Sequence, residues 1–127
     1  MWEVNLSTFA AWVEHAVAPT GPGIYAISKG NADNLIYIGL TVQADGLRAR
    51  LKQFHRSATI GQPGHAGGVT FHSKFGSDVA DLLFAVHIPH VINPQANVMG
   101  AYTQYAERFL IWQHVARHGS LPACNTA

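Results

Sequence analysis

Two short runs rich in β-branched and aromatic residues lie close together in the first third of the chain, at residues 24–28 and 35–39. Residues 29–34 separate them and consist largely of Gly, Asn and Asp. Two such runs joined by such a segment predict an antiparallel β-hairpin. The fold is therefore expected to contain an antiparallel sheet near its N-terminal end.

Helical patterns flank this hairpin. Residues 7–17 carry apolar side chains at spacings of three and four, with Ser7 as a candidate N-cap, and predict a short amphipathic helix. Residues 46–57 predict a second, basic helix. Its expected core-facing side chains are Leu47, Leu51 and Phe54. The segment 58–78 contains five glycines and is predicted to be a loop.

The C-terminal half predicts one more strand and one long helix. Residues 82–92 are apolar and β-branched, which indicates a buried strand, with Pro89 marking an edge or a bulge. Residues 98–118 form the longest helical pattern, closed by Gly119 at the C-cap position. Four aromatic residues at helical spacing are expected in the core, namely Phe9, Trp12, Phe109 and Trp112.

Three strands and three helices predict an α+β fold with a small, mostly antiparallel three-stranded sheet flanked by helices. The 127 residues suit a single domain, in which residues 1–19 form an N-terminal helical extension and residues 20–127 the core. Disorder is excluded because 48% of the residues are hydrophobic and only 12% are charged.

Nothing in the chain indicates export or membrane insertion. Cys124 is the single cysteine, so no internal disulfide forms. The N-terminus has no basic region followed by an apolar stretch, and no apolar run approaches the roughly 18 residues of a membrane span. We expect a cytoplasmic protein that does not associate with membranes.

The hairpin carries a specific pair of tripeptides. Gly23-Ile24-Tyr25 opens the first run, Tyr37-Ile38-Gly39 closes the second, and eleven residues separate the two tyrosines. This ordered pair resembles the signature of the GIY-YIG nuclease family. Three later features also resemble that family: Leu47-x-x-Arg50, Glu107 before a run of apolar residues, and Pro122-x-x-Asn125. The resemblance spans residues 23–125.

The resemblance implies a metal-dependent endonuclease that hydrolyses DNA phosphodiester bonds. Glu107 would hold a divalent metal, Mg²⁺ or Mn²⁺, completed by water and phosphate oxygens. The implied catalytic residues are Tyr25, Tyr37, Arg50, His55, Glu107 and Asn125. The expected substrate-binding residues are Gly39, Arg48, Lys52 and His72.

Several of these roles have alternatives. The loop before the basic helix leaves the register open between Arg48 and Arg50. The family's histidine position falls on Phe54 here, so either the neighbouring His55 or His72 takes that role. A tyrosine with a pKa of about 10 is a poor base at neutral pH. Nearby cations are expected to lower that pKa, and Tyr37 is favoured over Tyr25 as the base.

The eight histidines do not form a zinc motif with the single cysteine. His114 and His118 are four residues apart on the last predicted helix, so they share a helix face. Among the histidines, which give only a weak signal for metal binding, this pair is the strongest candidate. His65 and His72 are expected to line the substrate groove or to cap loops.

Overall charge gives only modest support for DNA binding. Lys and Arg total 8 against 7 acidic residues, and half of these cations lie in residues 48–56. Cleaving both strands of DNA would require a homodimer. Either this homodimer or a partner protein is expected to direct the protein to its DNA target. The alternative function is a catalytically weak or inactive module of the same fold that binds nucleic acid or another protein.

Overall fold

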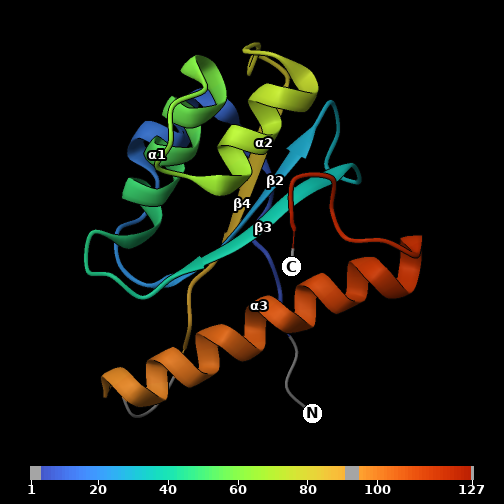
Figure 1. The fold of residues 1–127 in the computed structure, drawn as a ribbon. Coiled ribbons are helices and arrows are strands. Elements are labelled where there is room, and N and C mark those ends of the chain that lie inside the picture. Colours follow the sequence, from blue (N-terminus) through green and yellow to red (C-terminus); the bar gives the residue numbers. More distant parts are fainter. Residues whose placement is uncertain (1–3, 91–94, 127) are drawn as a thin grey trace.

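The computed structural model describes residues 4–90 and 95–126, and it places a β-sheet between two layers of helices (Figure 1). The elements in chain order are β1 (Ala10–Ala11), the 3₁₀ helix η1 (Trp12–Val17), β2 (Gly23–Lys29), β3 (Leu35–Thr41), α1 (Gly46–Ile60), α2 (Ala66–Phe75), β4 (Leu82–His87) and α3 (Ala96–His118). Helices α1 and α2 cover one face of the sheet, and α3 crosses the other face (Figure 1). The predicted α+β class is confirmed.

The sheet has four strands in the order β1-β4-β2-β3, and each neighbouring pair is antiparallel. The predicted hairpin is β2 and β3, in a register that places Tyr25 opposite Gly39 and Tyr37 opposite Ile27. The prediction of three strands is wrong because the short β1 pairs with β4, Ala10 lying opposite Phe84.

This added strand also changes the predicted N-terminal helix. Ser7 does not cap a helix: its backbone N–H donates to the Val86 carbonyl at 2.8 Å, and its Oγ accepts from the Val86 N–H at 3.0 Å. The helix starts only at Trp12, is a 3₁₀ helix, and leaves Val13 78% exposed. Pairing with a distant strand therefore replaces the local helical pattern over residues 7–11.

Two apolar cores lie on the two faces of the sheet. Successive residues of a strand point to opposite faces, so Tyr25 and Ile27 face α1 and α2, whereas Ile24 and Ala26 face α3. Leu47, Leu51 and Phe54 on α1 are fully buried in the first core, as predicted.

The prediction of a loop over residues 58–78 is wrong, because it contains the last turn of α1 and the whole of α2. Glycine in a helix usually indicates weak helical tendency. In α2 it permits close packing instead: a Cβ on Gly67 would lie 2.5 Å from the Tyr37 ring, and one on Gly68 would lie 2.7 Å from the Phe54 carbonyl oxygen.

The C-terminal half follows the sequence prediction more closely. Strand β4 ends at His87, before Pro89, and residues 91 and 92 of the predicted strand lie outside the described residues. Helix α3 ends at His118, and Gly119 at the C-cap adopts the left-handed conformation with φ of 81°. Of the four aromatic residues expected in the core, Trp112 is 64% exposed, so that prediction is wrong for it. In the described part of the chain, no helix combines the length and apolarity needed to span a membrane.

Candidate active site

The hairpin register brings Tyr25 and Tyr37 to the same face of the sheet. Their ring centroids are 5.9 Å apart. Gly39 makes this approach possible, because a Cβ there would lie 2.6 Å from the Tyr25 hydroxyl oxygen and 2.7 Å from the Tyr37 ring. Gly39, expected from the sequence to bind substrate, makes room in the structure for the two phenols.

A histidine from the N-terminus of α2 completes this pair. His65 is 1% exposed, and its Nε2 lies 2.7 Å from the Tyr25 hydroxyl oxygen. Its ring centroid lies 5.1 Å from that of Tyr37. We call Tyr25, Tyr37 and His65 the tyrosine cluster. Sequence reasoning placed His65 in a groove or at a loop cap, but it missed this contact with Tyr25.

The hydrogen bonds around His65 define its tautomer. The Gly68 backbone N–H can only donate, so Nδ1 of His65, 3.2 Å away, accepts with its lone pair. Burial, with a smaller contribution from the Arg50 charge, lowers the pKa of His65 to about 3, so the ring is neutral at pH 7. The proton therefore sits on Nε2 and is donated to the Tyr25 oxygen, which leaves the Tyr25 proton for another acceptor.

Arg50 is the cation that faces the tyrosine cluster. Its Nη1 donates to Gln53 Oε1 and, at 3.4 Å, to the Gly64 carbonyl just before His65. Its positive charge acts on both tyrosines, lowering the pKa of each against the larger effect of burial. Arg48 points elsewhere: its Nε donates to the Ala18 carbonyl at 2.7 Å and ties α1 to the segment before β2.

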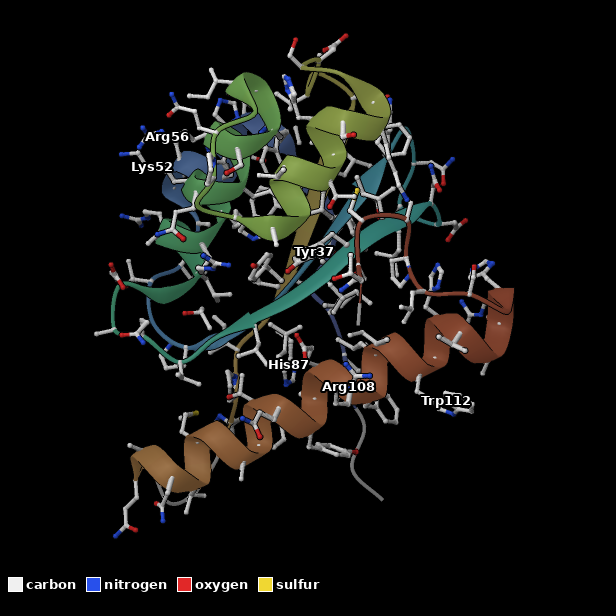
Figure 2. All side chains as sticks on the ribbon, in the orientation of Figure 1. Tyr37, Lys52, Arg56, His87, Arg108 and Trp112 are labelled. Carbon is white, nitrogen blue, oxygen red and sulfur yellow. The ribbon has the colours of Figure 1, made fainter. Side chains whose placement is uncertain are left out.

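The other cations of α1 lie on its outer side. Figure 2 shows Lys52 and Arg56 projecting from α1 away from Tyr37, and Arg56 bonds to Gln62. Residues two apart on a helix differ by roughly 200° in direction. Lys52 therefore cannot share the face of Arg50, and the structure does not bring it to the tyrosine cluster (Figure 2).

Neither proposed catalytic histidine contacts the tyrosine cluster. Nδ1 of His55 accepts from the Trp12 indole N–H at 2.8 Å, and the His55 ring stacks on His15 with centroids 4.8 Å apart. His72 bonds through Nδ1 to the Ala58 carbonyl at 2.8 Å and ties α2 to α1. Both histidines therefore hold secondary-structure elements together, and the histidine that contacts a tyrosine of the cluster is His65.

Glu107 lies on α3, which crosses the face of the sheet opposite to α1 and α2 (Figure 1). It is half-buried, and burial raises the pKa of its carboxyl group, opposed by Arg108. Its charge adds a minor increase to the pKa of Tyr37, which burial mainly raises. Among the described residues no ion pair or hydrogen bond occupies this carboxylate. One unpaired carboxylate suits Mg²⁺, which keeps several waters and needs few protein ligands.

Asn125 fixes the C-terminal segment against the edge strand. Its side-chain Oδ1 accepts from the Ile38 N–H and its Nδ2 donates to the Ile38 carbonyl, each at 2.9 Å. The neighbouring Cys124 N–H donates to the Ile36 carbonyl at 2.7 Å. Asn125 thus mimics a paired strand beside Tyr37.

Burial makes both phenols weaker acids. Burial raises the pKa of Tyr25 far above its ordinary value, Tyr37 adds to the increase, and Arg50 opposes it. Burial also raises the pKa of Tyr37, against the opposing effects of Tyr25 and Arg50. The expectation that nearby cations give a net lowering is therefore wrong for the ligand-free protein. Tyr25 is fully buried, so Tyr37 is the phenol that solvent reaches.

No protein-family model, curated protein or solved structure matches this chain. The described part of the chain also contains no group of three or more His, Cys, Asp or Glu side chains arranged to hold one metal ion.

Proposed function

We propose that this protein is a metal-dependent endonuclease of the GIY-YIG type that hydrolyses DNA phosphodiester bonds. The observation that supports it best is the convergence of Tyr25, Tyr37 and Arg50 on one face of the sheet, with a minor effect of the Glu107 charge on the pKa of Tyr37. These four residues come from β2, β3, α1 and α3, and they are the residues on which the sequence resemblance rests.

Each side chain has a chemical task in this reaction. Water adds to phosphorus, the bond to the 3′ oxygen breaks, and negative charge builds on the non-bridging oxygens. Arg50 presents a planar guanidinium that binds those oxygens and stabilises this charge. A Mg²⁺ or Mn²⁺ ion bound by Glu107 would supply Lewis-acid stabilisation of the phosphate and the leaving oxygen.

The tyrosines would orient the attacking water. Tyr37 is the more accessible phenol and would hold that water, while Tyr25 is held in place by the His65 N–H. Because the pKa of Tyr37 is raised, little phenolate is present at neutral pH. We therefore expect the nicking rate to increase with pH above 7, and Tyr37→Phe to be slower with a flatter pH profile.

A plasmid-nicking assay with Mg²⁺ or Mn²⁺ tests this function. Glu107→Gln keeps the shape but removes the charged ligand, and Arg50→Ala removes the phosphate contact. We expect each to slow nicking by at least about 100-fold, consistent with the loss of a charge-stabilising group at an active site. Arg48→Ala is the matched control, because Arg48 faces the Ala18 carbonyl, and should change the rate less than about threefold.

Absence of metal-dependent nicking by the pure wild-type protein would overturn this function, as would equal nicking by Glu107→Gln. The second candidate is a DNA-binding module without efficient catalysis, favoured by the raised pKa of both tyrosines. Salt-dependent binding of a short duplex by a protein that does not nick would support it.

A further inference from the structure

The C-terminal end of α3 carries a second group of side chains, unconnected with the tyrosine cluster. His114 and His118 are one helical turn apart, and their ring centroids are 4.5 Å apart. Two imidazole nitrogens bound to one tetrahedral ion lie roughly 3.4 Å apart, given metal–nitrogen bonds of about 2.0–2.1 Å. Rings at this separation can therefore turn their nitrogens onto the same ion.

A hydrogen bond to His114 determines which of its ring nitrogens keeps a lone pair for a metal ion. Its Nδ1 lies 2.8 Å from the Ser120 carbonyl oxygen, which can only accept, so Nδ1 carries the proton and donates it. Nε2 of the neutral ring is then left with a free lone pair. A histidine that binds a metal commonly donates its other N–H to a backbone carbonyl in this way. The His118 side chain is exposed, and it makes no hydrogen bond with the residues that the structure describes.

Both rings line a cavity of about 560 Å³ between α3, the β2–β3 turn and the N-terminal segment. Asp33 from the turn lines the same cavity and favours a cation, whereas Arg117 opposes one. The site also lies at the C-terminal end of a 23-residue helix, where the aligned peptide dipoles favour positive charge.

We propose that His114 and His118 form a two-histidine chelate for a divalent transition-metal ion of the zinc, nickel, cobalt or copper type. Imidazole favours these ions over Mg²⁺, which prefers oxygen ligands. The described residues supply no third ligand of the His, Cys, Asp or Glu type, so water or a second molecule completes the coordination. This site is separate from the ion that Glu107 would hold.

Calorimetric titration of the untagged, full-length protein with Ni²⁺ or Zn²⁺, without DNA, tests this site. His114→Ala and His118→Ala should each weaken binding at least about tenfold, because each leaves a single imidazole, a loss of about 1.4 kcal/mol or more. His90→Ala is the control for another exposed histidine and should bind as the wild type does. His15→Ala tests the other close pair, His15 and His55, and should also leave binding unchanged.

The electron paramagnetic resonance spectrum of the Cu²⁺-loaded protein gives a second readout, in which two nitrogen ligands should appear in the wild type and one in His118→Ala. Absence of binding by the wild type would overturn the proposal. Equal binding by the wild type and the His114→Ala/His118→Ala double variant would overturn it too. Neither measurement depends on DNA cleavage, so failure of this site and failure of the proposed nuclease function are distinguishable.

Discussion

His65 and His114 are both held through Nδ1 by a backbone group, but in opposite senses. In the tyrosine cluster a backbone N–H donates to Nδ1 of His65, which leaves the proton on Nε2 for Tyr25. At the end of α3 a backbone carbonyl accepts from Nδ1 of His114, which leaves a lone pair on Nε2. One local hydrogen bond thus makes one histidine a donor to a phenol and the other a candidate metal ligand.

The tyrosine cluster and the α3 histidine pair also differ in how deeply their histidines are buried. His65 is 1% exposed, with both ring nitrogens bonded to protein, so neither is open to an ion. His114 is half-buried and His118 is exposed at a cavity. A change at His65 should therefore affect folding, whereas a change at the α3 pair should affect ligand binding and leave the fold intact.

The largest expected effect is a loss of stability at acidic pH, caused by protonation of His65. The pKa of His65 is about 3 in the folded protein and about 6.5 when unfolded, so the unfolded state binds more protons below pH 6.5. This contribution to stability is complete above about pH 6.5 and is lost as the pH falls toward 3. Between pH 7 and 4.5 it amounts to on the order of 2–3 kcal/mol.

Urea unfolding at pH 7 and pH 4.5 measures this loss. His65→Asn removes the titrating group and should lose less free energy of unfolding between the two pH values than the wild type. His114→Asn is the matched control and should lose as much as the wild type. Equal losses in the wild type and His65→Asn would show that His65 does not titrate as its buried contacts require.

The next largest effect is expected from Gly39→Ala. Its Cβ would lie 2.6 Å from the Tyr25 hydroxyl oxygen, and the Tyr25 side chain is fully buried. Overpacking of this kind costs about 1–3 kcal/mol. Gly100→Ala on α3 is the control, since nothing lies within 4 Å of the new Cβ, and it should stabilise by up to about 1 kcal/mol. An unchanged urea midpoint for Gly39→Ala would show that the two phenols can move apart to accommodate the new Cβ atom.

The hairpin, α1 and α3 were predictable because their signals are local: turn residues between two strands, helical periodicity and a C-terminal glycine. The sequence alone also favours Arg50 over Arg48 as the arginine that faces the core side of α1. Arg50 lies between the buried Leu47 and Phe54 at spacings of three and four, so helical periodicity already places it on the inner face of α1.

The missed features depend on contacts between distant parts of the chain. Gly67 and Gly68 suggested a loop, but they serve close packing against Tyr37 on β3 and Phe54 on α1. The hydrogen bond of His65 with Tyr25 spans 40 residues. Strand β1 has only two residues and depends on β4 as a partner. Local sequence carries no signal for any of these pairings.

A smaller effect on stability is expected in the C-terminal segment, which connects α3 to β3. After α3 the backbone returns to β3, and Asn125 bonds twice to Ile38 beside Tyr37 (Figure 1). Asn125→Ala removes both hydrogen bonds and should cost about 1–2 kcal/mol of unfolding free energy, measured in urea. Asn5→Ala, at an exposed position whose backbone carbonyl is bonded to His87, should change it by less than about 0.5 kcal/mol.

The same Asn125 variant tests whether the two regions are independent. Its affinity for Ni²⁺ should equal that of the wild type, because His114 is held by Ser120, five residues before Asn125. A parallel loss of Ni²⁺ affinity and of stability would show instead that the C-terminal segment couples the α3 histidines to the tyrosine cluster.

The smallest effect is expected from His118→Ala without metal. The side chain is exposed, so the free energy of unfolding should change by less than about 0.5 kcal/mol. Zn²⁺ at three times its dissociation constant should then stabilise the wild type by about 0.8 kcal/mol and His118→Ala much less, because a ligand stabilises only the state that binds it. Thermal unfolding with and without Zn²⁺ measures both values. A large loss of unfolding free energy in His118→Ala without metal would show that His118 stabilises the fold. The contrast with His65 would then fail, since both histidines would act through packing.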